Sequence, residues 1–343
     1  MKNQKHILVI RLSAMGDVAM TAVVIKAFVA QNPDTKITML SRAFLKPIFE
    51  DIPNVNFYAA DTKGKHKGIL GIYKLYKELK TLNIDAVADL HNVMRSKLLN
   101  FFFGKTPSAT LDKGRAEKKA LVAIENKVFK QLKTTHERYA DVFRELGYTI
   151  DLSKLTFAPA KTLNQNLAKI IGNTENKLIG IAPFAQHKSK WYPLDLMEKI
   201  IETLSENQNT KILLFGGGEE EISQLNVIAS KSKNTVCIAG KIRLKEELLL
   251  ISNLDCMLSM DSGNGHFSAL YGVPTITLWG GTHPYAGFRP FHQPKENSFT
   301  PNLKKYPHIP YSVYGNKMLD GYEDAMRTIE PKSVSNRVLE IIN

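Results

Sequence analysis

The sequence predicts an α/β protein built from two doubly wound, Rossmann-like domains that face each other across a cleft. Three observations carry this prediction. A buried strand, a glycine-containing turn and a helix start follow one another at 6–28, and a similar series recurs at 257–288. Strand and helix patterns alternate in both halves of the chain. At 343 residues, the chain is also longer than a single hydrophobic core usually supports.

Each element is expected from its apolar pattern. Short β-branched runs without alternation indicate buried parallel strands, and apolar residues at helical spacing indicate helices. In the first half these patterns predict strands at 7–10, 37–40, 55–58, 86–90 and 109–111, and helices at 17–30, 43–50, 69–82, 94–103 and 136–146.

The second half repeats the alternation after a polar stretch at 156–176, which holds at most one short helix and is the expected domain junction. We therefore expect a first domain at 1–160, a second at 177–320, and a C-terminal segment at 321–343 whose helix, 334–342, is amphipathic. The predicted strands are 178–182, 211–215, 235–238, 256–260 and 275–279, and the predicted helices are 194–204, 219–229, 244–252 and 263–270.

The chain is strongly basic. Its formal net charge of +13 indicates an anionic partner, such as a phosphorylated substrate, an acidic membrane surface or a nucleic acid. Lysine clusters concentrate in the first half, for example at 63–67 and 113–119. We expect neither a signal peptide nor a membrane-spanning helix. Cys237 and Cys256 lie in apolar runs and are expected to be buried thiols of a reducing compartment.

Two turns are candidates for ligand chemistry. Asp17 begins the helix after the first strand, where open α/β sheets place their ligands, so it is either a candidate catalytic carboxylate or an ordinary helix cap. Near the other end, Ser262-Gly263-Asn264-Gly265 opens a helix directly after Asp261. A helix start presents unpaired N–H groups and the positive end of the helix dipole, which suits a phosphate or diphosphate.

Six motifs in a fixed order make the chain resemble the bacterial lipopolysaccharide heptosyltransferases (glycosyltransferase family nine) over almost its whole length. They are Ile-Arg-Leu-Ser-Ala-Met-Gly-Asp at 10–17, Asp89-Leu90-His91-Asn92 with Arg95-Ser96, His136-Glu137-Arg138-Tyr139, Lys190-Trp191-Tyr192-Pro193, Phe215-Gly216-Gly217-Gly218-Glu219, and Met260-Asp261-Ser262-Gly263 with His266.

The resemblance implies a GT-B architecture in which the C-terminal helix of 321–343 packs back on the first domain. It also implies an inverting transfer of heptose, or a related sugar, from a nucleotide-sugar such as ADP-heptose to an acidic lipopolysaccharide core. It implies Asp17 as the general base. For the donor it implies Lys190, Glu219, Asp261, Ser262, Gly263, Asn264, Gly265 and His266, and for the acceptor Arg95, Arg115, Lys118 and Arg138.

The same resemblance implies an enzyme at the cytoplasmic face of the inner membrane, in transient contact with that membrane. Metal-dependent glycosyl transfer generally uses an Asp-x-Asp pair, which the chain lacks, so we expect a metal-independent enzyme without a cofactor. The chain departs from the family's pattern at 185–187 and 281–288, which leaves the donor sugar open. His283 and Tyr285 are candidates either for sugar contacts or for loop packing.

Rival functions fit less well. A nicotinamide oxidoreductase requires G-x-G-x-x-G after the first strand, where only Gly16 occurs, and no P-loop is present. A nucleic-acid-binding protein would suit the charge, but its basic clusters lack interleaved aromatic residues. A glycolipid-binding protein with an inactive site stays open, although Asp17, Lys190, Glu219 and Asp261 together favour an enzyme.

Overall fold

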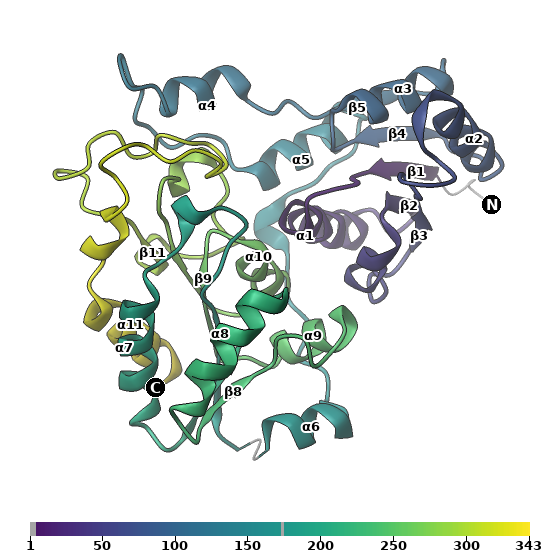
Figure 1. Cartoon of the computed structure of the whole chain (residues 1–343). Helices are drawn as coiled ribbons and strands as arrows, with labels where there is room; N and C mark the ends of the chain where they lie inside the picture. The colour runs from purple at the N-terminus through teal and green to yellow at the C-terminus, as the bar shows by residue number, and fades with distance from the viewer. Residues whose placement is uncertain (1–4, 173–174) are drawn as a thin grey trace. The chain divides into compact units, whose positions relative to one another are not determined.

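The computed structural model describes residues 5–172 and 175–343, and the chain divides into two compact units (Figure 1). Unit 1 consists of the residues up to Gly114 together with Lys133–Thr156. Unit 2 consists of Arg115–Leu132 together with Phe157–Asn343. The expected α/β class with two parallel sheets is confirmed.

Unit 1 is built on a parallel sheet whose strand order is β3-β2-β1-β4-β5. The strands are β1 (Lys5–Ile10), β2 (Thr35–Ser41), β3 (Val55–Ala59), β4 (Ala86–Asp89) and β5 (Ser108–Thr110). Ile7–Ile10 of the central strand are fully buried, as a continuous apolar run between two helical layers requires.

Helices cover both faces of this sheet. From β1 the chain moves through β2 to β3, then returns to β4 and β5 on the other side of β1, so right-handed crossovers place the connecting helices on opposite faces. One face carries α2 (Gly68–Lys80) and α3 (Met94–Phe103), which share an apolar core with the sheet. α1 (Met15–Gln31) connects β1 to β2 and packs against α5 (Thr135–Glu145).

Unit 2 repeats the arrangement with a parallel sheet in the order β11-β10-β9-β6-β7-β8. Its strands are β6 (Lys177–Ala182), β7 (Thr210–Leu214), β8 (Thr235–Cys237), β9 (Cys256–Met260), β10 (Thr275–Leu278) and β11 (Ser298–Phe299). α7 (Leu194–Ser205) and α8 (Glu219–Ser230) share one core with the sheet. The reversal after β8 places α9 (Leu244–Ile251) and α10 (Gly263–Leu270) on the other face.

The last helix packs within unit 2. α11 (Pro331–Ile342) lies against α7, whereas the family resemblance implies a C-terminal helix that packs back on the first domain. Its apolar face, Val334, Val338 and Ile342, is buried in the core that contains the apolar stripe of α7. Amphipathic spacing predicts that a helix buries one face but does not name the surface that receives it.

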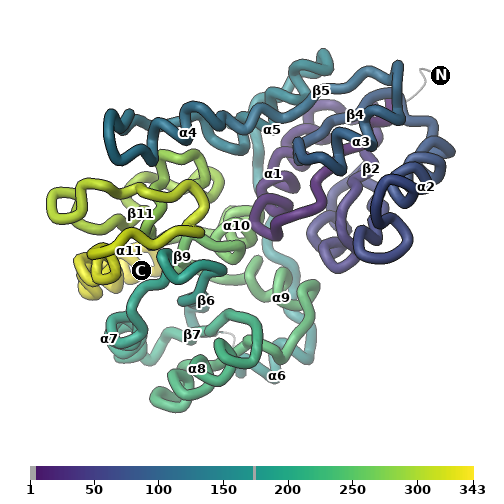
Figure 2. The backbone as a smooth tube through the Cα atoms, turned by 45° about the horizontal axis from the view of Figure 1, so that its top comes forward, coloured from purple at the N-terminus to yellow at the C-terminus, as the bar shows by residue number. Residues whose placement is uncertain are grey.

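A segment from the first half of the sequence belongs to unit 2. Residues 115–132 contain the short helix α4 (Arg115–Leu121), and Figure 2 traces them beside the yellow C-terminal loops. Leu132 N–H donates to the carbonyl of Tyr285 (2.9 Å), and Leu121 and Leu132 share a small apolar core with Ala286. Lys127 Nζ donates to the carbonyls of His308 (2.6 Å) and Pro310 (2.9 Å).

Two further expectations can be compared with the structure. The predicted helix at 43–50 is a 3₁₀ turn, Ala43–Ile48, because Pro47 lies inside it and has no N–H to donate. The expected short helix of the junction is α6 (Gln165–Ile171); residues 173–174 of that junction lie outside the described residues. Within 5–172 and 175–343, no helix combines the length and the hydropathy that a membrane crossing requires.

Candidate active site

The carboxyl edge of the unit 1 sheet gathers the first set of candidate functional side chains. β1 and β4 are neighbours, and the chain leaves them in opposite directions, which makes this pair the topological switch point where open α/β sheets bind ligands. β1 ends at Ile10, so Arg11 emerges directly at the edge and Asp17 follows in the first turn of α1. β4 ends at Asp89, which is followed by His91.

Arg11 and Asp17 form an ion pair at this switch point. Arg11 is buried, its Nη1 donates to the carbonyl of Leu90 (2.7 Å), and its guanidinium lies 5.7 Å from the ring centroid of Tyr139. Asp17 is 27% exposed. Within the described residues, both contacts of its carboxylate use Oδ2, one from Arg11 and one from the N–H of Ala14 (3.3 Å). Oδ1 is therefore the oxygen available to a ligand.

Asp89 organises the neighbouring loop. It is fully buried; its Oδ1 accepts the N–H groups of His91 and Asn92 (both 2.9 Å), and its Oδ2 accepts the hydroxyl of Ser96 (2.8 Å). These bonds stabilise a tight turn in which Asn92 has a φ of 46°. The motif at 89–96 is therefore a positioning device for the loop that carries His91.

His91 was quoted in a motif but was not among the expected site residues. It is buried, and its Nε2 lies 3.4 Å from Ser13 Oγ. Burial, followed by the positive charge of Arg11, lowers the His91 pKa to about 3, so the imidazole is neutral at physiological pH. A neutral ring can accept a hydrogen bond at one nitrogen and donate one at the other. The signal that could have found it is its place, two residues after a switch-point strand.

The two arginines predicted for the acceptor in unit 1 lie in different surroundings. Arg95 is half-buried at the start of α3, and its charge acts on the titration of His91. Arg138 is buried on α5 and pairs with Asp112 (3.3 Å). A Cβ on Gly114 would overlap the Arg138 guanidinium, so the glycine is required for that close approach.

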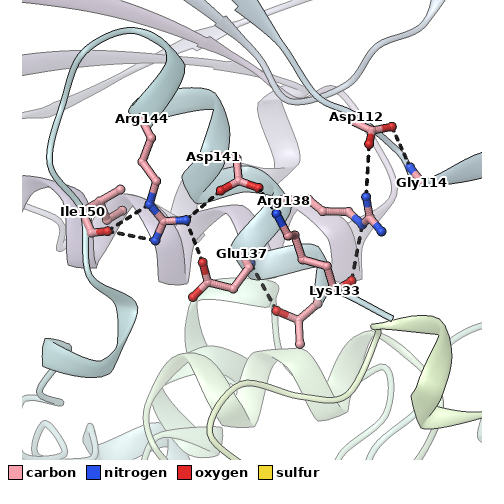
Figure 3. Close-up of polar contacts among 9 residues, drawn as sticks. Asp112, Gly114, Lys133, Glu137, Arg138, Asp141, Arg144 and Ile150 are labelled. Carbon is pink, nitrogen blue, oxygen red and sulfur yellow. Dashed lines mark hydrogen bonds and ion pairs between the residues drawn. The ribbon is translucent and has the colours of Figure 1, made fainter. Parts of the chain in front are cut away.

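Figure 3 separates Arg138 from its neighbours on α5. Arg144, not Arg138, binds Glu137 and Asp141 (both 2.8 Å), and it also donates to the carbonyl of Ile150. Arg138 turns to the other side of the helix, toward Asp112 and the carbonyl of Lys133. The two carboxylates on α5 are thus bound by Arg144, and Arg138 pairs with a residue outside its own helix.

The unit 2 sheet has its own switch point, between β6 and β9. Asp261 follows β9, and Lys190 ends the 3₁₀ turn Lys188–Lys190 in the loop after β6. Lys190 Nζ lies 2.8 Å from Asp261 Oδ2, and the two side chains are 14% and 8% exposed. The hydroxyl of Thr282 donates to the same carboxylate oxygen (2.9 Å). The sequence did not identify Thr282, because its contact depends on the fold of the loop after β10.

The glycine-rich turn forms the N-terminus of α10, as expected. Ser262 is the N-cap residue, and Gly263 and Asn264 begin the helix half-buried. Gly265 serves packing: a Cβ there would come within 2.7 Å of Ser259 Oγ on the adjacent strand. His266 is buried in the first turn of the helix. The half-buried part of this turn is therefore Ser262–Asn264.

A second glycine turn follows β7. Gly218 caps α8 with a φ of 89°, and Glu219 is exposed at the first helical position. Glu221 rather than Glu219 folds back on the turn, and its Oε2 accepts the N–H of Gly217 (2.9 Å). Glu219 is thus left exposed at the carboxyl edge of the strand beside β6.

The remaining candidates lie on segment 115–132 and on the loop that it contacts. His283 and Tyr285 pack with Phe129, with ring centroids 4.9 Å apart in both pairs, so loop packing, one of their two candidate roles, is present in the structure. Burial lowers the pKa of His283 to about 4. Arg115 is exposed on α4, whereas Lys118 is buried with its ammonium 4.2 Å from the centroid of the Phe288 ring. Arg115 and Lys118 therefore belong to unit 2, whereas Arg95 and Arg138 belong to unit 1.

Across the described parts of the chain, no three His, Cys, Asp or Glu side chains gather as a metal site would require. Cys237 and Cys256 are buried free thiols, and burial raises the pKa of Cys256 to about 12.

Comparison with known proteins places this geometry in a family. The model of glycosyltransferase family 9 (heptosyltransferase) matches residues 72–313, more than half of the chain. Lipopolysaccharide heptosyltransferase 1 of Campylobacter coli is 26% identical to the chain over 98% of each protein. A solved glycosyl transferase family 9 protein from Veillonella parvula has a TM-score of 0.76 at 18% identity, covering 100% of this chain and 98% of that one.

The Escherichia coli heptosyltransferase WaaC, solved with ADP-2-deoxy-2-fluoro heptose, has a TM-score of 0.66 at 16% identity, covering 98% of this chain and 99% of that one. These likenesses establish the GT-B fold. From the family match we conclude that the chain is a glycosyltransferase and belongs to glycosyltransferase family 9, the heptosyltransferase family.

Proposed function

We propose that this enzyme transfers a heptose from ADP-heptose, with inversion, to an acidic sugar acceptor of the lipopolysaccharide core. The observation that supports the proposal best is that the switch point of each sheet carries a paired cation and carboxylate: Arg11 with Asp17, and Lys190 with Asp261. Relatives named as lipopolysaccharide heptosyltransferases, and a structural neighbour solved with an ADP-heptose analogue, suggest the substrates.

The donor is assigned to unit 2. Lys190 and the N-terminus of α10 at Ser262–Asn264 supply positive charge and N–H groups for the diphosphate. Asp261 is held by Lys190 and Thr282, which suits a carboxylate that accepts hydrogen bonds from sugar hydroxyls. Glu219, exposed beside the glycine turn, is our candidate for the ribose hydroxyls, and His266, buried in the first turn of α10, is a further donor candidate.

The acceptor is assigned to unit 1, with Asp17 as the general base. Arg11 holds Oδ2 and leaves Oδ1 to take the proton of the acceptor hydroxyl. Arg95 and Arg138 are the proposed partners of acidic groups on the acceptor, because a guanidinium binds phosphate and carboxylate in a bidentate manner. Arg115, on α4, is a further candidate partner for an acidic group of the acceptor. The ammonium group of Lys118 instead lies over the ring of Phe288.

The proposed reaction is a single displacement. The acceptor oxygen forms a bond to the anomeric carbon while its proton passes to Asp17 Oδ1, and the bond from that carbon to the β-phosphate oxygen of ADP breaks. The electron pair of the broken bond leaves with ADP, whose growing negative charge is stabilised by Lys190 and the α10 dipole. We expect no metal ion in this scheme, and the enzyme to work at the cytoplasmic face of the inner membrane where its lipid-linked acceptor lies.

Nucleotide binding tests the donor assignment. Isothermal titration of ADP, UDP, GDP and NAD into the purified protein, with and without a chelator, should give selective ADP binding that the chelator does not change. Selectivity for UDP or GDP would keep glycosyl transfer but discard ADP-heptose as the donor. Binding that vanishes with the chelator would overturn the metal-independent scheme, and binding of NAD alone would overturn the proposed function.

A further inference from the structure

One surface of unit 1 carries apolar side chains that the fold leaves unburied. α2 turns Ile72, Leu75 and Leu79 toward the sheet. Its other side exposes Ile69, Leu70 and Tyr73, and Leu70 is 85% exposed, almost as much as in an extended chain. A helix that has already buried one face gains nothing within its own domain from a second apolar face.

The neighbouring helix continues this surface. α3 packs against α2, and its Phe101 is 75% exposed. The ring of Phe102 lies 5.3 Å from that of Tyr73 and 5.9 Å from that of Phe101, centroid to centroid, so aromatic contacts join the two helices. We call the surface formed by Ile69, Leu70, Tyr73, Phe101 and Phe102 the α2–α3 face; Figure 1 shows the two helices side by side.

Positive charge surrounds the α2–α3 face. Exposed lysines lie on both helices and next to them: Lys63, Lys67, Lys74, Lys77, Lys80, Lys97 and Lys105. The one carboxylate in 62–84 is Glu78, and it is already bound by Lys65 (2.7 Å), His66 (3.2 Å) and Tyr58. Residues 94–105 contain no acidic residue. The face is therefore both apolar and strongly cationic.

We propose that the α2–α3 face docks the enzyme on the surface of an anionic lipid bilayer. Aromatic and aliphatic side chains flanked by lysines are the combination that inserts at a lipid interface, because the apolar groups enter the acyl boundary while the ammonium groups meet anionic headgroups. A second copy of the chain would oppose lysines to lysines. The inference extends the proposed function, since a lipid-linked acceptor brings its enzyme to a membrane, but its test needs no transfer reaction.

The experiment is cosedimentation of the full-length protein with vesicles of phosphatidylethanolamine and phosphatidylglycerol, compared with vesicles of phosphatidylcholine alone. We expect binding to the anionic vesicles that weakens as salt is raised. Lys74→Gln with Lys77→Gln should weaken it roughly 25-fold, at about fivefold per lysine. Leu70→Ser with Phe101→Ser should weaken it at least 100-fold, at about tenfold or more per buried side chain.

Matched controls come from unit 2. Val227 is exposed and apolar on α8, and Lys304 and Lys305 are adjacent exposed lysines. Val227→Ser and Lys304→Gln with Lys305→Gln should bind vesicles as the wild type does. Thermal unfolding of every variant confirms that it is folded, which is expected because all of the changed side chains are exposed.

Three results would overturn the inference: no vesicle binding by the wild type, equal losses in the controls, or unchanged binding by the α2–α3 variants. A concentration-dependent dimer that Leu70→Ser with Phe101→Ser dissolves would assign the face to a second copy instead. ADP affinity should be the same in all of these variants. If ADP binding fails while vesicle binding follows the α2–α3 face, the proposed function is wrong and the docking surface stands.

Discussion

Asp17→Asn is the sharpest test of the proposed chemistry, because the amide keeps the shape of the side chain and an oxygen for Arg11 but cannot take a proton. Removing a general base slows turnover by roughly 10²–10⁴-fold. This range corresponds to about 2.7–5.5 kcal/mol of activation free energy. The donor lies with unit 2 in our proposal, so the affinity for ADP should be unchanged.

The structure also sets the expected cost in stability. Asp17 is partly exposed, and Arg11 keeps its bond to the carbonyl of Leu90, so the variant should lose about 1–3 kcal/mol of the free energy of unfolding. A defect confined to turnover would therefore not arise from unfolding at 25 °C. Asp34→Asn is the matched control, since Asp34 is exposed in unit 1 and makes no ion pair within the described residues.

The assay is ADP release from ADP-heptose in the presence of acceptor, with ADP affinity measured by titration calorimetry on the same samples. Turnover within threefold of the wild type would remove Asp17 from the reaction. Equal losses of turnover and ADP affinity would show that the substitution acts through the fold rather than through the proton transfer.

Three further changes test other parts of the site. Lys190→Met should weaken ADP binding and slow transfer together, and should cost about 3–5 kcal/mol in stability because a buried carboxylate loses its cation, whereas Lys188→Met in the same turn should do neither. The pKa of His91 is lower in the folded state than in the unfolded state, so its contribution to the free energy of unfolding is complete above about pH 6.5 and is lost as pH falls toward 3. The wild type should therefore lose stability between pH 7 and pH 5, and urea unfolding should show that His91→Gln loses about 2 kcal/mol less over the same interval. Lys127→Met should speed proteolytic cleavage within 122–131, since two carbonyls lose their donor, and Lys130→Met, at an exposed position, should leave the cleavage rate unchanged.

Much of the fold could be predicted because buried parallel strands have an unmistakable composition. Ile7–Ile10 is a continuous apolar run, Cys256–Met260 is apolar except for Ser259, and each strand is buried near the centre of its sheet. The prediction of an α-helix at 43–50 was wrong. The apolar spacing fits a helix, but Pro47 has no N–H to donate, and this limits the segment to a 3₁₀ turn.

Other features depend on contacts between distant residues, which no local pattern encodes. Three consecutive glutamates open α8, and only the fold shows that Glu221 is the one that binds the turn. Thr282 meets Asp261 only because neighbouring strands bring their loops together. His91, by contrast, lies two residues after the strand β4, so its position near the site could have been predicted from the sequence.

The discontinuous make-up of unit 2 has a consequence for biosynthesis. Lys127 is bound by a carbonyl that lies 183 residues later in the chain. At about 5–20 residues per second, a ribosome needs roughly 10–40 s to complete that partner. During this interval unit 1 can fold together with residues 133–156. The apolar side chains of Leu121 and Leu132 stay exposed to solvent until the residues that bury them have been synthesised. The nascent chain therefore carries an exposed apolar segment, 121–132, that is prone to aggregate until the loops after β10 are made and bury it.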